Sequence, residues 1–400
     1  MAAVLVEDLM SVDEALDFAL VARARSAVGR AAWTTSCSAR RNGGKERIMG
    51  YDLSQKQVRQ REGRRCAMPA RVLAVALLTA LGLAAPANGA TAYRAIDLGV
   101  LPGGDGSQAY AIGDGGEIVG AASVHGLDHA FSYTRSRGMV DLGGPTSVAN
   151  GVNGKGEVVG QWAHAFLYTP SLGMVDLGAP SISAFGVNDS GELVGTSTFG
   201  SSGAQAFSYT SKGGMVELGA VLGGRQSFAY AVSDRGEIVG QIVGRIAQAF
   251  SYMPGRGVVD LGLLPRWNYS YAAAVNDSGE IVGYGGRDSI SGQTVHAFVY
   301  TPRRGMVALG AFGRYARHQS AASGVNDSGQ IVGWSDTATS TRAFSYTRSG
   351  GMVRLPMPRG ATGSVATGVN DSGQIVGYAD MRGSRSVQHA ILWQPMRRRR

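Results

Sequence analysis

Residues 187–195 read Val-Asn-Asp-Ser-Gly-Glu-Leu-Val-Gly, and the chain contains seven close variants of this nonapeptide. The intervals between their closing glycines are 40, 35, 45, 43, 50 and 44 residues. Those closing glycines are Gly120, Gly160, Gly195, Gly240, Gly283, Gly333 and Gly377. A period in this range is typical of an array of equivalent supersecondary units, so it outweighs the two-domain expectation for a chain of 400 residues.

Each repeat contains the pattern of four short strands. In the copy that starts at Ala184, residues 184–188 and 192–195 are apolar segments separated by a polar turn at 189–191. Residues 205–210 alternate as a third strand, and residues 215–219 form a fourth after a glycine-containing turn. Four short strands joined by hairpins and repeated about every 44 residues predict the blade of a β-propeller.

The two ends of the repeat region are complementary. A fourth-strand sequence such as Gly-Met-Val-Asp-Leu-Gly at 138–143 follows six of the third strands, but none follows the last one at 389–393. A matching segment stands at 93–99 instead. We therefore predict an all-β, seven-bladed β-propeller of four-stranded blades, with the ring closed by residues 93–99 in the last blade. A solenoid is the alternative, although it would expose its terminal units.

The turn between the first and second strands has a glycine at the same place in every repeat. These glycines are Gly116, Gly156, Gly191, Gly236, Gly279, Gly329 and Gly373. Asn-Asp-x-Gly fits a turn whose last residue is left-handed, where only glycine avoids a Cβ penalty. The preceding Asn or Asp can bond its own backbone. A calcium loop is a weaker interpretation, because calcium takes six or more oxygens and this motif offers one or two side chains.

Histidine recurs at the start of the third strand, in the sequence His-Ala-Phe-Ser-Tyr-Thr. The residues at this position are His129, His164, Gln205, Gln248, His296, Arg342 and His389. A ring of metal-binding histidines is one hypothesis, but three repeats lack the ligand and equivalent positions in separate blades lie far apart. We expect a hydrogen-bonded structural role, with no metal and no cofactor.

The region before the repeats has the organisation of an export signal. Residues 72–85 are apolar, follow Arg64, Arg65 and Arg71, and precede an Ala-Thr-Ala cleavage sequence at 90–92. The run is too short for a typical membrane-spanning helix. We predict a signal peptide at 68–92, cut before Tyr93, with a buried core helix as the alternative.

Residues 1–67 are then interpreted as a non-structured extension or a mis-called start. A genuine cytoplasmic extension is the alternative, and it would make residues 72–85 an internal anchor. Both cysteines, Cys37 and Cys66, lie upstream of the predicted cleavage site.

Net charge does not indicate a nucleic-acid partner. The chain carries +9, but residues 93–400 carry only +4, all of it supplied by the basic tail at 397–400. The predicted propeller at 93–396 is therefore near neutral, so the high pI is no evidence for a basic binding surface. We interpret the tail as a solvated end and expect a monomer without nucleic-acid partners.

Loop lengths differ between the two predicted faces of the ring. The first-to-second and third-to-fourth turns are short and share one face, whereas long and varied loops share the other, as at 263–271, 285–295 and 311–320. Variable loops on a rigid scaffold are typical of binding sites. The candidate binding residues are Arg266, Trp267, Tyr269, Tyr271, Tyr284, Arg287, Asp288, Trp334 and Tyr378. Aromatic rings beside Arg and Asp can stack on a sugar or peptide and bond to it; ordinary capping of strand ends is the alternative.

No catalytic motif emerges from residues 93–400. They contain no G-x-S-x-G elbow, no H-E-x-x-H, no Walker sequence and no cysteine nucleophile. We predict a non-catalytic module that binds an extracellular glycan, peptide or protein through its long-loop face. A polysaccharide hydrolase or lyase is one alternative, with Asp288, His318 and Asp336 as the groups that occur in single repeats. A structural surface or matrix protein is another.

The repeats resemble a known family. His129-Ala-Phe131, His164-Ala-Phe166 and His296-Ala-Phe298, with Asp-Leu-Gly and Val-Asn-Asp-Ser-Gly segments between, are similar to the HAF-type extracellular repeat of exported bacterial proteins. The resemblance covers residues 95–393 and implies export and a repeat β fold; it implies no established activity. Many members end in a hydrophobic sorting tail, whereas this chain ends in four arginines. That departure favours a secreted or periplasmic protein over an anchored one.

Overall fold

The computed structural model describes residues 91–180, 182–198, 203–224, 226–287, 294–313, 319–383 and 387–396. Within these ranges the chain forms strands and turns only. The predicted extension at 1–67, all but the last two residues of the predicted signal peptide, and the basic tail at 397–400 lie outside them. Across the ranges just given, no helix is long and apolar enough to cross a membrane.

The strands follow the order that the repeat predicts. The first strands are β2 (Gly104–Ile112), β6 (Val148–Val152), β10 (Ile182–Val187), β14 (Gln226–Val232), β18 (Tyr269–Val275), β22 (Ser320–Val325) and β26 (Ala361–Val369). The second strands are β3 (Ile118–Val124), β7 (Val158–Gln161), β11 (Leu193–Ser197), β15 (Ile238–Val243), β19 (Ile281–Arg287), β23 (Ile331–Asp336) and β27 (Ile375–Met381).

The outer strands complete each unit. The third strands are β4 (Leu127–Thr134), β8 (His164–Thr169), β12 (Gln205–Thr210), β16 (Ala247–Met253), β20 (Thr294–Thr301), β24 (Thr341–Thr347) and β28 (Val387–Pro395). The fourth strands are β5 (Gly138–Asp141), β9 (Gly173–Pro180), β13 (Gly214–Glu217), β17 (Gly257–Asp260), β21 (Gly305–Gly310), β25 (Gly351–Arg354) and β1 (Tyr93–Asp97).

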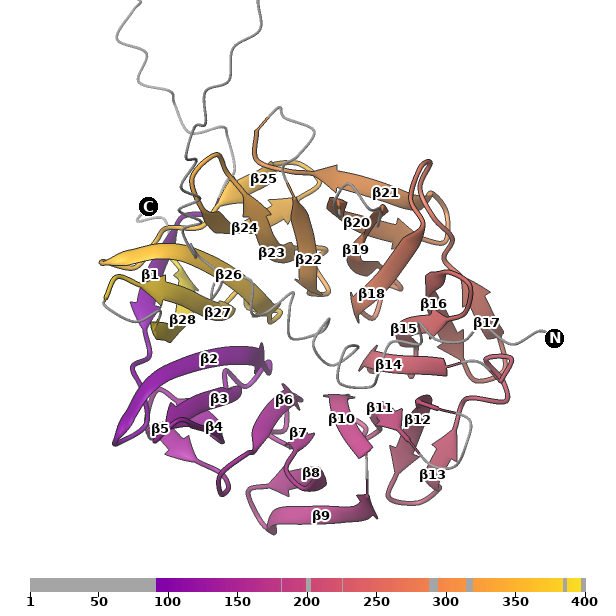
Figure 1. Cartoon of the computed structure of the whole chain (residues 1–400), viewed down its shortest axis with the longest axis horizontal. Helices are drawn as coiled ribbons and strands as arrows, with labels where there is room; N and C mark the ends of the chain where they lie inside the picture. The colour runs from indigo at the N-terminus through magenta and orange to yellow at the C-terminus, as the bar shows by residue number, and fades with distance from the viewer. Residues whose placement is uncertain are drawn as a thin grey trace, which may run out of the picture. The chain divides into compact units, whose positions relative to one another are not determined.

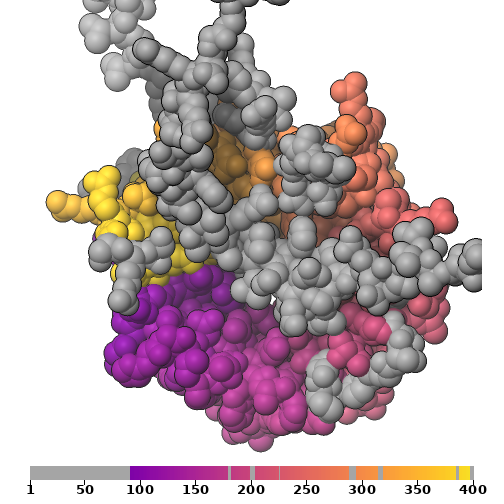
Figure 2. Space-filling view, in the orientation of Figure 1, coloured from indigo at the N-terminus to yellow at the C-terminus, as the bar shows by residue number. Residues whose placement is uncertain are grey.

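The sheets are antiparallel and surround a common centre. Five of them have four strands, and an eight-stranded sheet consists of β14–β17 and β18–β21 joined by a single parallel bridge, Ala247 to Tyr269. The first strands lie nearest the centre and the fourth strands lie at the periphery (Figure 1). Each first strand contacts the first strand of the next unit, and β26 contacts β2. The indigo start and the yellow end of the described chain lie beside each other (Figure 2).

The N-terminal strand pairs with the C-terminal one. β1 runs antiparallel to β28, with Tyr93 opposite Pro395 and Asp97 opposite Ile391. The Leu98 N–H donates to the Ala390 carbonyl, and the Met396 N–H donates to the Ala92 carbonyl. The segment predicted to complete the last sheet therefore lies in the fourth-strand position of that sheet.

The hydrophobic core lies between consecutive sheets. Each interface joins two small side chains of one unit to three residues of the next. The first unit supplies a second-strand Val and a third-strand Ala, and the next supplies a first-strand Ala, a second-strand Ile or Leu and a third-strand Phe. One example is Val239 and Ala249 against Ala272, Ile281 and Phe298. The last unit packs on the first in the same way. Large residues on one strand face and small ones on the other thus explain the His-Ala-Phe alternation, because successive side chains point to opposite faces.

The closing glycine of each nonapeptide is required by a close approach of backbone. A Cβ at any of the seven would lie between 1.8 and 2.0 Å from a carbonyl oxygen of the first strand, as for Gly195 and the Ser183 oxygen. The turn glycines have a different reason for being glycine: their φ angles lie between 73° and 81°, in the left-handed region that disfavours side chains.

Candidate functional site

The Val-Asn-Asp turns meet around the axis of the sheets. The Asn side chain organises its own turn: the Asn188 Oδ1 accepts the N–H groups of Ser190 and Glu192 at 3.1 and 2.9 Å. This is the local bonding that Asn favours in turns. The same side chain also reaches the neighbouring unit, where its Nδ2 donates to the Ser233 carbonyl at 3.0 Å.

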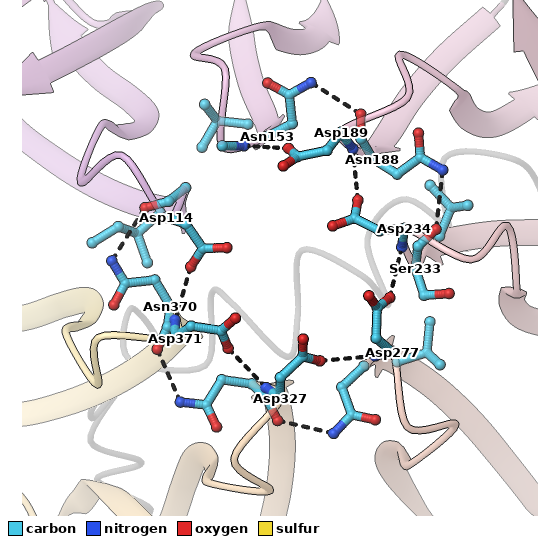
Figure 3. Close-up of a pocket in the computed structure, with 18 of the residues that line it drawn as sticks. Asp114, Asn153, Asn188, Asp189, Ser233, Asp234, Asp277, Asp327, Asn370 and Asp371 are labelled. Atoms are coloured by element: carbon cyan, nitrogen blue, oxygen red, sulfur yellow. Dashed lines mark hydrogen bonds between the residues drawn. The ribbon is translucent and has the colours of Figure 1, made fainter.

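These bonds link the units in one direction around the axis (Figure 3). Five interfaces carry the Asn bond, from Asn153, Asn188, Asn276, Asn326 and Asn370. Six carry a second bond in which a backbone N–H donates to the carboxylate of the next unit, accepted by Asp114, Asp189, Asp234, Asp277, Asp327 and Asp371. Gly113 and Gly154 stand at the Asn and Asp positions where the first unit meets the second, so neither side chain is available there.

The aspartates line a polar depression of about 160 Å³ at the end of the axis where the short turns lie. Partial burial and the like charge of neighbouring aspartates raise the pKa of Asp234 and Asp371, despite their hydrogen bonds. Within the described part of the chain, no three His, Cys, Asp or Glu side chains are grouped so as to hold a metal ion. The bonds described above give these carboxylates a structural role, which is to join adjacent turns.

Every first strand contains a β-bulge at the same position. The bulged residues, one from each unit, are Tyr110, Asn150, Phe185, Tyr230, Ala273, Ser323 and Thr367. A bulge leaves one residue out of the ladder and re-aims its side chain, and such bulges are common next to active sites. The repeats are uniform on either side of this position, with Ala before it and Gly or Ala after it, yet the bulged residue itself differs.

Six of the seven bulged residues line an axial cavity of about 110 Å³, all except Tyr110. Its other described lining residues are Tyr271, Tyr284, Ala321, Ala322 and Val365. All of these residues except Tyr284 of β19 precede the Asp turns along the first strands, so the cavity lies between the acidic depression and the ends where the long loops attach. None of these described lining residues is charged.

Aromatic rings form a continuous row along one side of this cavity. The Tyr230 ring stacks on Tyr271 with 4.3 Å between centroids, and Tyr271 stacks on Tyr284 at 4.7 Å. Phe185 extends the row, 5.6 Å from Tyr230. Burial, reinforced by the nearby Tyr284, raises the pKa of the Tyr230 phenol, so Tyr230 stays protonated at neutral pH.

The predicted aromatic residues do not form one exposed platform. Tyr284, Trp334 and Tyr378 are buried, with 9%, 8% and 1% of their surface exposed, and they pack in one cluster between sheets. Tyr271 contributes to the axial row, and the Tyr269 hydroxyl donates to the Thr294 carbonyl at 3.1 Å. Packing therefore accounts for the three buried rings, and only Tyr271 and Tyr284 of the predicted aromatics reach the cavity.

The remaining predicted residues lie around the unit formed by β18–β21. Trp267 is half-buried and stacks on His296, while Arg266 and Arg287 are exposed. Arg266 has a φ of 74°, which is uncommon for a residue with a side chain. Asp288 and His318 lie outside the described residues, whereas Asp336 accepts a hydrogen bond from the Thr341 hydroxyl.

The recurrent histidines bond to aspartates of the adjacent fourth strand. His129 lies 2.8 Å from Asp141, His164 lies 2.9 Å from Asp176, and Gln248 makes the equivalent bond to Asp260. His389 bonds Asp97 of β1 at 2.8 Å in the same geometry. His296 is the exception, because Ala308 stands opposite it; burial against Trp267 lowers the pKa of His296.

Sequence reasoning missed three features. The first is the bulged position, which is the residue that varies within a nearly constant Ala-x-Gly/Ala-Val segment, although the alternation of a strand does not distinguish it.

The second is a bond between units: a first-strand Ser, such as Ser270, accepts the N–H of a third-strand Ala of the preceding unit, here Ala249 at 2.9 Å. Trp162 lies 44% exposed in the tight connection between β7 and β8, on the side of the long loops.

Comparison with known proteins identifies the fold and no more. No protein-family model matches the chain, and no curated protein matches its sequence. The β-propeller domain of the trilobed protease from Pyrococcus furiosus is similar in structure, with a TM-score of 0.51 and 10% identity over 73% of this chain and 94% of that domain. The acylaminoacyl peptidase from Pyrococcus horikoshii gives 0.50 and 12% over 72% of this chain and 51% of the peptidase. The chain therefore has a β-propeller fold.

Proposed function

We propose that this chain is an exported, seven-bladed β-propeller of the HAF-type repeat family, closed by β1, that acts as a non-catalytic binding module. Its partner would be an extracellular glycan, peptide or protein. The antiparallel pairing of β1 with β28 supports closure, as does the contact of β26 with β2. The His389–Asp97 bond, which repeats the His129–Asp141 bond of an internal unit, supports it independently.

The binding site that we propose is the end of the axis where the long loops attach. The observation that carries this proposal is the division between constant and variable positions. Turn aspartates, closing glycines and the Ala-Phe pairs recur because they hold the units together. The six bulged residues that share the axial cavity are all of different types. Recognition is expected where a rigid scaffold presents differing side chains.

Exposed side chains on the long-loop side would supply the outer part of the site. Trp162, Arg266 and Arg287 are exposed there on two different units. Trp and Arg are, with Tyr, enriched among the residues that dominate binding energy at interfaces. The rigid Trp ring loses little conformational entropy when it is fixed, and the planar Arg guanidinium can donate several hydrogen bonds at once. A partner that covers the long-loop end could contact these side chains and the axial cavity together.

A binding role is favoured over catalysis by where the titratable groups lie. His129, His164 and His389 are each bonded to a fourth-strand aspartate at the rim, in a geometry that recurs from unit to unit. A catalytic group would be expected to occur once and to face a cavity. The proposed location, secreted or periplasmic, is supported by the signal-peptide pattern at residues 68–92.

The test is a panel of extracellular polysaccharides, oligosaccharides and peptides, scored both for binding and for release of reducing ends or cleaved peptide. Trp162→Ala and Arg287→Ala are expected to weaken binding, and Lys155→Ala on the short-turn side serves as the matched control. Product release would overturn the non-catalytic reading. Equal loss in the Lys155 variant would overturn the assignment to the long-loop end, and failure of the whole panel would reject the proposed ligand classes.

A further inference from the structure

The axial cavity has the features of a site for a single flat ring. Its volume of about 110 Å³ is slightly smaller than cavities of about 150 Å³ that accept benzene, so one six-membered ring is the largest group that would fill it. One wall consists of Phe185, Tyr230 and Tyr271. The lining also includes small residues, Ala273 beside Tyr271 on β18 and Ala321 and Ala322 on β22.

Packing against ring edges is the interaction that this wall offers, because Tyr271 has Tyr230 stacked on it at 4.3 Å and Tyr284 at 4.7 Å. Phe185, Tyr230 and Tyr271 are half-buried, so their rings are not fully consumed by packing. Centroid distances of 4.3 to 5.6 Å within the row leave the rings fixed by one another. A pre-positioned aromatic surface loses little freedom on binding, and it favours a flat apolar face as its partner.

Two polar groups at the ends of the row are without partners in the described protein. The Asn150 Nδ2 donates to the Ala184 carbonyl, which leaves its Oδ1 free as an acceptor. The Ser323 hydroxyl has no hydrogen-bond partner within the described residues, although Ser323 is partly buried and lines the cavity. Both residues are only partly buried, so a ligand that bonds to these atoms would take the place of water.

The charge of the ligand is restricted by the surroundings. Among the residues that the structure describes, the lining has no charged side chain that could compensate an ion removed from water. The six turn aspartates, which lie beyond the cavity on the axis, further oppose an anion. A neutral group is therefore the compatible one.

We infer that the axial cavity binds one uncharged six-membered ring that packs against the Phe185–Tyr230–Tyr271 wall and bonds through its edge to Asn150 and Ser323. Such a ring can come from a phenol or from a terminal pyranose, each of which has an apolar face and at least one hydroxyl at its edge. This inference rests on the proposed function, because it names the chemistry that the binding module would recognise at its centre.

The experiment uses the full chain and three probes: phenol, methyl β-glucopyranoside and benzoate. Binding is followed by ligand-observed NMR saturation transfer and titration. Phenol or the glucoside is expected to bind, and the probe that binds identifies the source of the ring. Benzoate is expected to bind at least tenfold more weakly than phenol. Absence of binding by both neutral probes, or equal binding of benzoate, would overturn the inference.

Variants test the position of the ring. Ala273→Tyr places in the cavity the side chain that the equivalent bulge of β14 already accepts, and it should abolish binding without lowering the melting temperature. Ser323→Ala leaves the cavity open and should weaken binding about three- to tenfold, the effect of one neutral hydrogen bond. Tyr110→Phe, at the one bulge outside the cavity, is the matched control. Unchanged affinity in Ala273→Tyr would refute the site.

The outcome can be separated from that of the proposed function. If a polymer of the panel binds and Ala273→Tyr has no effect on it or on the small probes, the binding module stands and the axial ring site does not. If the small probes bind as expected but Trp162→Ala and Arg287→Ala leave polymer binding unchanged, the axial site stands and the long-loop surface does not.

Discussion

Replacement of β1 is the most direct test of ring closure. In the full chain, Tyr93–Asp97 would be exchanged for Gly-Pro-Gly-Pro-Gly, because proline removes the N–H donors that the ladder requires. The variant loses five registered pairs with β28, or about four to six backbone hydrogen bonds at about 1 kcal/mol each. It also uncovers Trp393, which is fully buried and packs against Tyr93 and Ala95, at a cost of about 2 kcal/mol.

The total of about 6 to 8 kcal/mol is comparable to the whole stability of a typical domain, about 5–15 kcal/mol. For a cooperative unit of this size it corresponds to a fall in melting temperature on the order of 10 °C, measured by far-UV circular dichroism. Exchange of β5, Gly138–Asp141, for Gly-Pro-Gly-Pro is the matched comparison and should have a similar effect. If the β1 variant melts with the wild type while the β5 variant does not, β1 contributes nothing to closure.

Three smaller perturbations follow from the same geometry. Gly195→Ala should lower the free energy of unfolding, measured in urea, by about 1–3 kcal/mol, because its Cβ would overlap a first-strand carbonyl. Gly144→Ala, whose Cβ would have no atom closer than 3.9 Å, should leave stability unchanged, and equal effects would contradict the close-approach argument. Asn188→Ala should lower the free energy of unfolding by about 1–3 kcal/mol, and by more than Ser233→Ala, because Asn188 joins two turns whereas the Ser233 side chain stabilises only its own turn. A larger effect of Ser233→Ala would be inconsistent with the inter-unit bonds. The pKa of Asp234 is raised in the folded state, so the folded protein binds more protons than the unfolded chain between the ordinary pKa of 3.8 and the raised value, and stability falls as pH rises through that window. Asp234→Asn should therefore raise the melting temperature at pH 7 and lose this advantage on acidification. A stabilisation by Asp234→Asn that grows on acidification would contradict this sign.

The architecture could be predicted from sequence because many residues of the repeat are determined by one physical requirement each. The closing glycines and the Ala-Phe alternation fixed the unit and its strand faces, and the misplaced fourth-strand segment at 93–99 located the pairing of the two ends. Each of these signals is local, or is a comparison of one repeat with another. Neither kind of signal requires knowledge of how far apart the units lie.

The site was less accessible because it depends on distances between repeats. Trp334 and Tyr378 follow the closing glycine, where a strand end looked exposed in sequence, but the next sheet covers both rings. The Asn-Asp turn was interpreted as satisfying only itself, yet Asn188 also bonds the neighbouring turn. The bulge at Tyr230 breaks the two-residue period, so an alternation pattern could not assign its direction.

The bulges have a consequence for how such proteins can diversify. A bulged residue makes no ladder bond, so its replacement leaves the hairpin intact, while the glycine and alanine neighbours hold the strands at a fixed spacing. A combinatorial library confined to the six bulged positions that line the cavity would therefore vary the chemistry of that cavity on an unchanged framework. If the axial cavity binds a ligand as proposed, the residues at these six positions would distinguish repeat proteins of this architecture by ligand before their structures are known.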